Sequence, residues 1–447
     1  MVDILNSIKI IQPSLSSLVF HSQLSSNMNS VRPKKVRLGM VGGGEGAFIG
    51  GIHRLAAQMD GKIELVCGAF SSNPEKAKAF GKTLFLSDER CYASYEEMFA
   101  REARLDRAER MELVAIVTPN HLHFPVAKLA LEYGFHVISD KPATLTLDQA
   151  IELKSIIEKT GLLYGLTHTY TGYPMIKEAR HRLKQGQLGQ IKKIIVEYPQ
   201  GWLASKDDEN SKQASWRLDP NKAGISCCMA DIGIHAANLA EYVTGLKITS
   251  LCAELTINVE NRLLDDDGTV MLRFDSGAHG ILLASQVCVG EENSLKLRVY
   301  GEHASIEWSQ LEPNSLWLKF SDQASQLIRT GVGQMAEETL ACMRTPAGHP
   351  EGYLEAFANI YLQFAKQIRQ HHDDNTVANS TNAKDNVNAS CGIPGIDEAI
   401  RGMAFIENVV AASQSEFKWH NFSLNPADIK PRTINEITRD NKEANDE

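Results

Sequence analysis

The sequence predicts an α/β protein in which an N-terminal, doubly wound parallel sheet precedes a larger α+β domain with an open, mostly antiparallel sheet. Between residues 36 and 168, strand-like and helix-like patterns alternate, which is typical of a parallel sheet whose strands are joined by helices. After about Tyr170, strand patterns follow one another instead. A third observation is the glycine-rich segment GMVGGGEGAFIGGIH, residues 39–53, which stands between the first strand and the first helix.

The first domain is expected to alternate strictly between strands and helices. Residues 113–119, LVAIVTP, are the clearest strand, because an uninterrupted apolar run is typical of a strand buried on both faces. The helix expected over 73–81 is opened by Pro74 and closed by Gly81, and a charged helix over 94–112 is expected to present a solvated face. The expected strands are 36–41, 62–70, 113–119, 135–140 and 162–168, and the expected helices are 46–59, 73–81, 94–112, 125–134 and 146–161.

The second domain is expected to contain a run of strands interrupted by a helix. Asp275-Ser276-Gly277 is a hairpin signal within residues 268–287. The expected strands lie in 190–199, 248–260, 268–287, 295–308 and 314–320, and the expected helices are 174–186, 231–245, 352–368 and 397–410. The predicted boundaries are a disordered extension over 1–33, a dinucleotide-binding domain over 34–168, a substrate-binding and oligomerisation domain over 169–425 with a mobile loop over 372–395, and a tail over 426–447.

Composition excludes several classes of function. The formal net charge is -9, which argues against nucleic acid or an anionic membrane as a partner. No apolar run is long enough to span a membrane, and the N-terminal residues lack the basic start and long apolar core of a cleaved signal peptide. The eight cysteines are dilute and form no C-x-x-C, so reduced thiols in the cytoplasm are expected, with Cys227 and Cys228 as packing residues rather than redox or metal ligands.

The glycine-rich segment predicts a site for the pyrophosphate of a dinucleotide. It reads Gly42-x-Gly44-x-x-Ala47 between a strand and a helix, where glycine permits a tight turn and a close approach of the backbone, and the helix N-terminus offers N–H groups to an anion. Gly46 and Phe48 complete this set of candidate cofactor-binding residues. A turn without a ligand is the alternative interpretation.

The end of the second strand bears on the choice of cofactor. An acid there would bind the ribose 2'-OH of NAD, whereas this chain has Ser71 and Ser72, followed by Lys76. Two hydroxyls and a lysine are compatible with a 2'-phosphate, so both NAD and NADP are retained. These residues could equally begin a turn before the helix at Pro74.

Three further segments carry residues suited to chemistry. Thr118 to His123 follow the clearest strand, at the edge where ligands of such sheets bind; His121 and His123 without a nearby carboxylate do not predict a metal. Lys141 lies just beyond another strand end and can point into a cleft. Asp231 and His235 are four residues apart, which on a helix places a carboxylate and an imidazole on one face as orienter and general base.

Together these segments resemble the glucose-fructose oxidoreductase / inositol dehydrogenase / MocA family, from about Lys35 to Ser415. The resemblance rests on the glycine-rich segment, on the block from VAIVTPNHLH to ISDKP, on GQLGQIKKI, on WRLDPNKAGISCCMADIGIHAANLAEYVTG, and on GHPEGYLEAFANIY. The DKP and DIGIH motifs in this order are its most specific part.

The resemblance implies a role for each matching residue. Lys141 is then the catalytic lysine, with Asp231 and His235 as its partners, and Asp140 replaces the usual glutamate. Residues expected beside the nicotinamide and its ribose are Thr118, Pro119, Asn120 and His123. Candidate substrate contacts are Asp231, His235, His168, Tyr170, Trp216, Arg217 and His349. A core tryptophan with a paired arginine and a capping histidine are alternatives for the last three. Departures from the family are a longer glycine loop, AGISCCMA before Asp231, and Asn238 where an aspartate commonly touches substrate.

The expected activity is NAD- or NADP-dependent oxidation of a secondary alcohol of a sugar, a sugar derivative or an inositol. His235 would take the hydroxyl proton, Asp231 would hold its tautomer, and Lys141 would stabilise the developing alkoxide, without a metal. Two alternatives are an NAD-dependent glycosidase of the same fold and a ligand-sensing regulator without turnover. A homodimer or homotetramer is expected, because open sheets of this kind commonly pack face to face.

Overall fold

The computed structural model describes residues 35–206, 211–377, 393–431, 433 and 435–437. The predicted extension over 1–33 lies outside the described residues, as does most of the predicted loop over 372–395. None of the described helices is long and apolar enough to cross a membrane.

The first sheet consists of five parallel strands in the order β2-β1-β3-β4-β5. The chain moves from β1 to β2 in one direction and then returns to place β3 on the other side of β1, so the switch point lies between β1 and β3. This confirms the predicted doubly wound sheet. The strands are β1 (Val36–Gly42), β2 (Ile63–Ala69), β3 (Leu113–Val117), β4 (His136–Ser139) and β5 (Tyr164–Leu166), joined by α1 (Phe48–Met59), α2 (Pro74–Thr83), α3 (Tyr95–Glu102), α4 (His123–Glu132) and α5 (Leu147–Thr160).

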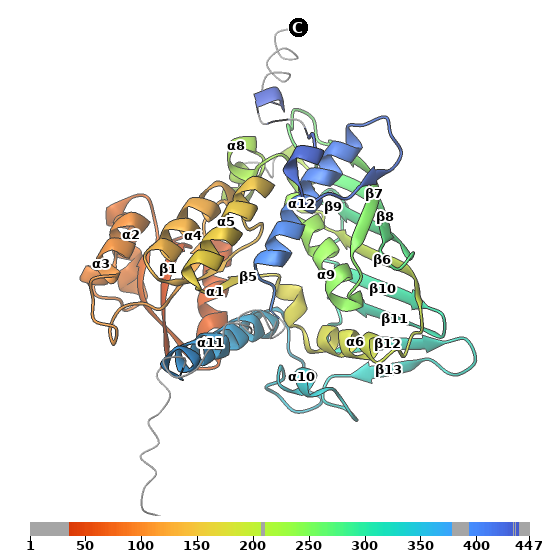
Figure 1. The fold of residues 1–447 in the computed structure, drawn as a ribbon, viewed down its shortest axis with the longest axis horizontal. Coiled ribbons are helices and arrows are strands. Elements are labelled where there is room, and N and C mark those ends of the chain that lie inside the picture. The colour runs from red at the N-terminus through yellow and green to blue at the C-terminus, as the bar shows by residue number, and fades with distance from the viewer. Residues whose placement is uncertain (1–34, 207–210, 378–392, 432, 434, 438–447) are drawn as a thin grey trace, which may run out of the picture. The chain divides into compact units, whose positions relative to one another are not determined.

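One face of this sheet is covered by a helix from far along the chain. Helix α11 (Tyr353–Val377) packs beside α1, and its Phe357, Tyr361 and Phe364 belong to the same buried cluster as β1 (Figure 1). His53 of α1 joins the two helices through a 2.7 Å hydrogen bond between its Nδ1 and the Tyr361 hydroxyl. The segment assigned from sequence to the second domain therefore completes the core of the first.

The second sheet has nine strands in the order β13-β12-β11-β10-β6-β9-β8-β7-β14. Only the β6–β9 pair among them is parallel, which confirms a large, mostly antiparallel sheet. Its strands are β6 (Ile191–Pro199), β7 (Ile248–Thr256), β8 (Asp267–Phe274), β9 (His279–Ser285), β10 (Lys296–Gly301), β11 (Ala304–Ser309), β12 (Ser315–Phe320), β13 (Gln326–Arg329) and β14 (His420–Asn421).

The two faces of the second sheet differ. Helices α6 (Pro174–Lys184) and α9 (Ile234–Thr244) cover one face of the sheet, and α12 (Ile396–Ser413) packs on α9, α5 and β7 (Figure 1). Alternate residues of the strands pack on α6 and α9 in the largest buried cluster. On the other face a cross-strand row runs across the sheet, namely Leu327, Trp317, Glu307, Arg298, Ile195, Ile281, Met271 and Cys252. Five large apolar side chains of this outer row are at least partly exposed: Leu327, Trp317, Met271, Ile281 and Ile195.

The structure corrects several expected elements. The helix expected over 94–112 ends at Glu102, because that carboxylate turns inward, is fully buried, and accepts hydrogen bonds from Tyr92, Arg90 and the backbone of Met111. Gly81 lies inside α2 rather than closing it, since the helix runs to Thr83. Helix α11 continues to Val377, into the segment predicted as a loop.

Several short elements were not expected from sequence. The residues before α9 form a π-helical turn, η5 (Met229–Gly233), rather than part of a regular α-helix. Three short α-helices also had no periodic signal: α7 (Lys212–Arg217), α8 (Pro220–Ala223) and α10 (Glu337–Leu340). Short 3-10 turns are η1 (Asp88–Arg90), η2 (Asn120–Leu122), η3 (Thr169–Gly172) and η6 (Pro426–Asp428).

Candidate active site

The glycine turn after β1 forms one wall of a cleft of about 650 Å³. Gly42 and Gly46 have φ of +82° and +71°, a left-handed backbone that favours glycine. A Cβ on Gly44 would stand 2.5 Å from the carbonyl oxygen of Phe70, so only glycine fits between this turn and β2. Helix α1 then begins at Phe48 with no acidic residue in its first turn and no side-chain cap among the described residues. Its N–H groups can therefore face an anion, and the turn fits the pyrophosphate of a dinucleotide.

Most of the predicted cofactor residues line this cleft. The lining includes Gly42, Gly44, Ala47, Ser71, Ser72, Thr118, Pro119, Asn120, His123, Asp140 and Lys141. Trp216 and Arg217, predicted as substrate contacts, also line it. Gly46 does not, and Phe48 lines a second cleft instead. The cleft thus spans the carboxyl ends of β1, β2, β3 and β4, where ligands of doubly wound sheets bind.

His123 and Asn120 support the loop after β3. The two ring nitrogens of His123 lie 2.6 Å and 2.8 Å from the carbonyl oxygens of Pro142 and Thr118. Asn120 donates from Nδ2 to the carbonyl of Ala223, which fastens the loop to α8. Both ring nitrogens of His123 therefore face backbone carbonyl oxygens of the surrounding loops.

A compact charge cluster lies where β4 and η5 meet. Lys141 Nζ lies 2.8 Å from Asp231 Oδ1 and also donates to the backbone carbonyl of Asp231. The other carboxylate oxygen, Oδ2, lies 3.2 Å from Arg217 Nε and accepts a 2.9 Å hydrogen bond from Gln286. Burial alone would raise the pKa of Asp231, but the charges of Arg217 and Lys141 outweigh it and lower that pKa well below its ordinary value. Asp231 is therefore a carboxylate that holds two cations in place.

His235 lies beside this cluster but pairs with another residue. Its Nδ1 is 3.4 Å from Nδ1 of His168, and the two rings meet edge to face at 83°. No hydrogen bond joins Asp231 to His235 in the described part of the chain, so the expectation that Asp231 orients His235 is wrong. Asp231 lies in the π-helical turn η5, and both of its carboxylate oxygens are occupied by Lys141, Arg217 and Gln286 instead.

A second cleft, of about 550 Å³, opens over His235. It shares Ile49, Asp140, Lys141, Gln213 and Arg217 with the first, so the two clefts meet at the catalytic lysine predicted from sequence. Of the predicted substrate contacts, Tyr170, Arg217, Asp231 and His235 line it. His168 lies behind His235, Trp216 lines only the first cleft, and His349 is exposed in a turn that borders neither.

Sequence reasoning missed much of the second cleft's wall. Lining residues without a motif are Tyr198, Gln200, Trp202, Asn293 and Gln310; Tyr353 lies in GHPEGYLEAFANIY but was given no role. Gln286, which does not line the cleft but binds Asp231, carries no motif either. Polar residues directly after the apolar strand β6 were a usable signal for Gln200, because they follow a strand end as Lys141 does. Asn293 and Gln310, which hydrogen-bond to each other, come from connections whose placement depends on the sheet order. Asn238, which stands where the family commonly has a substrate-touching aspartate, lines neither cleft but a separate cavity of about 230 Å³ between α9 and α12.

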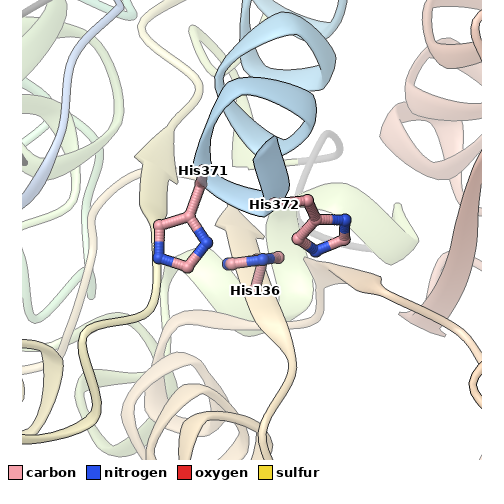
Figure 2. Close-up of side chains that lie close together, drawn as sticks. All are labelled: His136, His371 and His372. Atoms are coloured by element: carbon pink, nitrogen blue, oxygen red, sulfur yellow. The ribbon is translucent and has the colours of Figure 1, made fainter. Parts of the chain in front are cut away.

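A second histidine cluster, also unpredicted, lies at the opposite edge of the first sheet. His136 at the start of β4 is flanked by His371 and His372 from the end of α11 (Figure 2). His136 Nδ1 accepts a 3.1 Å hydrogen bond from the backbone N–H of Leu163, so its neutral ring carries the proton on Nε2. His371 Nε2 donates to the carbonyl of Gly161. The buried member therefore has no lone pair to offer a metal ion.

Comparisons with known proteins agree with this architecture. Residues 36–168 match the oxidoreductase family with an NAD-binding Rossmann fold (GFO_IDH_MocA), and residues 176–307 match the GFO/IDH/MocA C-terminal domain. The uncharacterised oxidoreductase YfiI of Bacillus subtilis is 33% identical over 401 residues, which cover 89% of this chain and 99% of YfiI.

Solved structures are similar over the same range. An inositol dehydrogenase homologue of Azotobacter vinelandii, solved with NAD+, is 32% identical with a TM-score of 0.80, covering 87% of this chain and 98% of that one. The same homologue was solved with NADH and myo-inositol, at 30% identity and a TM-score of 0.77, with the same coverage. An oxidoreductase of Sinorhizobium meliloti is 41% identical with a TM-score of 0.76, covering 87% and 99%. The chain therefore belongs to the GFO/IDH/MocA family of NAD-binding oxidoreductases.

Proposed function

We propose that the protein is an NAD- or NADP-dependent dehydrogenase that oxidises a secondary alcohol of a sugar, a sugar derivative or an inositol. One observation carries the proposal: the cleft at the glycine turn and the cleft over His235 meet at Lys141. A cofactor bound along the first cleft and a polyol bound in the second would approach each other at this amine. The inositol dehydrogenase homologue, crystallised with NADH and myo-inositol, supports the substrate class.

The residues of the chain divide the work of such an oxidation. The bound cofactor supplies the hydride acceptor. His235 accepts the hydroxyl proton, while Lys141 donates a hydrogen bond to the same oxygen and stabilises its developing negative charge. Asp231 holds the Lys141 ammonium through the 2.8 Å ion pair, rather than holding His235. Burial, with the charge of Lys141 adding to it, lowers the pKa of His235 well below 6.5, so at neutral pH its imidazole is neutral and able to take a proton.

The second cleft is suited to a hydroxyl-rich ligand. Its wall combines hydroxyl, amide and aromatic side chains such as Tyr170, Gln200 and Trp202. Among the described lining residues, Asp140, Asp231 and Glu292 face only two cations, Lys141 and Arg217, and both cations lie beside Asp231. A neutral polyol therefore fits this wall better than a sugar phosphate does.

The test is a screen of sugars, sugar acids and inositols with NAD and with NADP, following the absorbance of the reduced nicotinamide. Lys141→Ala is expected to lower kcat by at least about 10²-fold through loss of charge stabilisation at the oxygen. Lys128→Ala is the matched control, because Lys128 forms an exposed ion pair with Glu152 on the outside of the first domain. Glycoside cleavage without net cofactor reduction, or a biological activity that survives Lys141→Ala, would contradict the dehydrogenase.

Cofactor binding is tested separately from turnover. Gly44→Ala places a Cβ against the Phe70 carbonyl and is expected to weaken NAD binding at least about tenfold, measured by calorimetry or by the fluorescence of the reduced cofactor. Gly51→Ala, on α1 where a Cβ meets no atom closer than 4.0 Å, is the control and is expected to bind as the wild type does. Equal affinity in the two variants would contradict a cofactor at this turn.

We also propose self-association through the outer face of the second sheet, as a homodimer or a homotetramer. The outer row places Leu327, Trp317, Met271 and Ile281 on this face, where a second copy would bury them. Light scattering on the wild type and on Trp317→Glu is the measurement. A wild-type monomer at micromolar concentration would contradict the proposal.

A further inference from the structure

We propose that His168 is a positioning residue for His235: it accepts a hydrogen bond from Nδ1–H of His235 and so keeps the Nε2 lone pair of His235 free for the substrate. This inference rests on the proposed function, in which His235 takes the hydroxyl proton. It transfers to His168 the task that the sequence motif suggests for Asp231.

The geometry brings one nitrogen of His235 to His168 and leaves the other for the cleft. The two Nδ1 atoms are 3.4 Å apart, and the ring centroids are 5.3 Å apart. His168 is 1% exposed and does not line either cleft, whereas His235 is 8% exposed and lines the second. Hydrogen bonds between catalytic groups are often long before substrate binds, and they shorten in the complex.

The tautomers of the pair are linked by this contact. In a neutral imidazole one nitrogen carries the proton and the other accepts. If His168 were the donor, His235 would carry its proton on Nε2 and could take none there from a substrate. If His235 is the donor, its Nε2 is a base. Only the second arrangement serves the proposed oxidation, and it needs an acceptor where His168 Nδ1 stands.

Other groups around His235 do not supply that acceptor. Both carboxylate oxygens of Asp231 are held by Lys141, Arg217 and Gln286. Tyr170 meets the His235 ring edge to face at 4.9 Å, while its hydroxyl hydrogen-bonds to Tyr198. His168 is thus the hydrogen-bonding partner that the described part of the chain provides for His235 Nδ1.

The fold keeps His168 neutral and fixed, as an acceptor must be. Burial, reinforced by the charge of Lys141, lowers the pKa of His168 to about 3, so its ring is neutral throughout the physiological range. Its backbone carbonyl accepts from both the N–H and the hydroxyl of Thr171, and its own N–H donates to Leu166. Both the backbone N–H and the backbone carbonyl of His168 are therefore hydrogen-bonded, which fixes the residue in the segment that follows β5.

Nitrogen NMR of the protein with 15N-labelled histidine, without cofactor or substrate, tests the pairing directly. Resonances of His168 and His235 are assigned from the His168→Asn and His235→Asn variants. In the wild type we expect His235 to carry its proton on Nδ1 and His168 on Nε2. A His235 ring protonated on Nε2 would overturn the proposal without any reference to activity.

Two substitutions separate positioning from packing. Asn at 168 can place its Oδ1 where Nδ1 stands and accept the same bond, whereas Leu fills the space but cannot accept. We expect His168→Asn to keep the His235 tautomer and to remain within about tenfold of wild-type kcat. His168→Leu is expected to lower kcat by about 10²-fold with little change in KM for the polyol, and to raise the fraction of His235 protonated on Nε2. Equal losses in both variants, with the tautomer of His235 unchanged, would overturn the proposal.

The outcomes distinguish this inference from the proposed function. If the tautomer of His235 depends on residue 168 but no polyol is oxidised by the wild type, the pairing stands and the dehydrogenase fails. If the wild type oxidises a polyol but the tautomer of His235 does not depend on residue 168, the dehydrogenase stands and the pairing fails. Should His168→Leu fail to fold by circular dichroism, the wild-type spectrum and His168→Asn still decide the question.

Discussion

The two groups of histidines lie at opposite edges of the same parallel sheet. His168 and His235 stand at the carboxyl ends of the strands, just after β5 and next to Lys141, which follows β4. His136 begins β4, and its neighbours His371 and His372 reach it from the end of α11 (Figure 2). Each group has a buried imidazole with a strongly lowered pKa, to about 3 for both His168 and His136.

The difference between them follows from the direction of the strands. At the carboxyl edge the chain leaves the sheet into loops and helix N-termini, which open into two clefts. At the amino edge helices end, and their carbonyls are exposed; Gly161, the cap of α5, accepts from His371, and Leu163 donates to His136. At the carboxyl edge His235 therefore lines an open cleft, whereas at the amino edge His136 Nδ1 and His371 Nε2 are bound by backbone groups. A lowered histidine pKa results from burial at both edges. Of the histidines in these two groups, only His235 combines such a pKa with an open cleft, which makes it the candidate base.

The largest expected difference between the two edges comes from substituting one histidine at each of them, in separate variants. His235→Ala is expected to lower kcat by about 10²- to 10⁴-fold, the usual contribution of a general base, at unchanged NAD affinity. His136→Asn, which keeps an acceptor for the Leu163 N–H, is expected to leave kcat within twofold of the wild type. Steady-state kinetics with the best substrate from the screen decide it. Comparable losses in the two variants would mean that the amino edge takes part in turnover.

A second test asks whether the carboxyl edge depends on the Asp231 charge. Asp231→Asn keeps the shape but leaves Lys141 and Arg217 without their counter-charge, so we expect kcat to fall about 10²-fold and the free energy of unfolding to fall by about 3 kcal/mol. Asp397→Asn, which breaks the exposed pair with Lys154, is the control, with a loss below about 1 kcal/mol. Urea unfolding measures both. A stability loss no larger than that of the control would refute the structural role given to Asp231.

A third test uses pH at the amino edge. Burial first, and then the charges of His371, His372, Arg110 and Arg369, lower the pKa of His136 from 6.5 to about 3. As pH falls below about 6.5 the unfolded chain takes up a proton at this residue while the folded chain does not, so stability is lost as pH falls from about 6.5 towards 3. Each pH unit in that window costs up to about 1.4 kcal/mol for this histidine.

His136→Asn removes that cost while keeping the hydrogen bond to Leu163. Between about pH 4.5 and 6 we expect the free energy of unfolding of the variant to fall less steeply than that of the wild type, by up to about 1.4 kcal/mol per pH unit. Denaturant unfolding at several pH values gives the two slopes. Parallel slopes would show that His136 is not the buried, neutral group described above.

The smallest expected effect concerns metal at the amino edge. Because His136 carries its proton on Nε2, Zn²⁺ at tenfold excess is expected to leave the Tm unchanged within about one degree. Differential scanning calorimetry with and without Zn²⁺ and a chelator measures it. If Zn²⁺ raised the Tm of the wild type by several degrees but not that of His136→Asn, His136 would bind the metal, and the tautomer assigned to it would be wrong.

Local chemistry in the sequence predicted much of this protein. The apolar run of β3, the glycine turn at Gly42 and the DKP and DIGIH motifs depend on a few neighbouring residues, so they could be interpreted without the fold. The strand and helix patterns were enough for the two sheets, whereas the pairing of Lys141 with Asp231 was implied by the resemblance to a known family. The end of helix α3 at Glu102 was not predicted from the sequence. A glutamate in a charged segment is expected to be solvated, and nothing in the sequence shows that this one is buried and accepts three hydrogen bonds.

What the sequence determined by itself was the alternation of elements and the residues at their ends, since backbone propensity and apolar periodicity act over a few positions. Which side chains face each other was decided by the tertiary structure alone. Asp231 pairs with Lys141 and Arg217 from distant segments, His168 contacts His235 across 67 positions, and α11 packs on β1 from more than 300 residues away. Such contacts depend on how the sheets order and pack, and no short stretch of sequence contains that information.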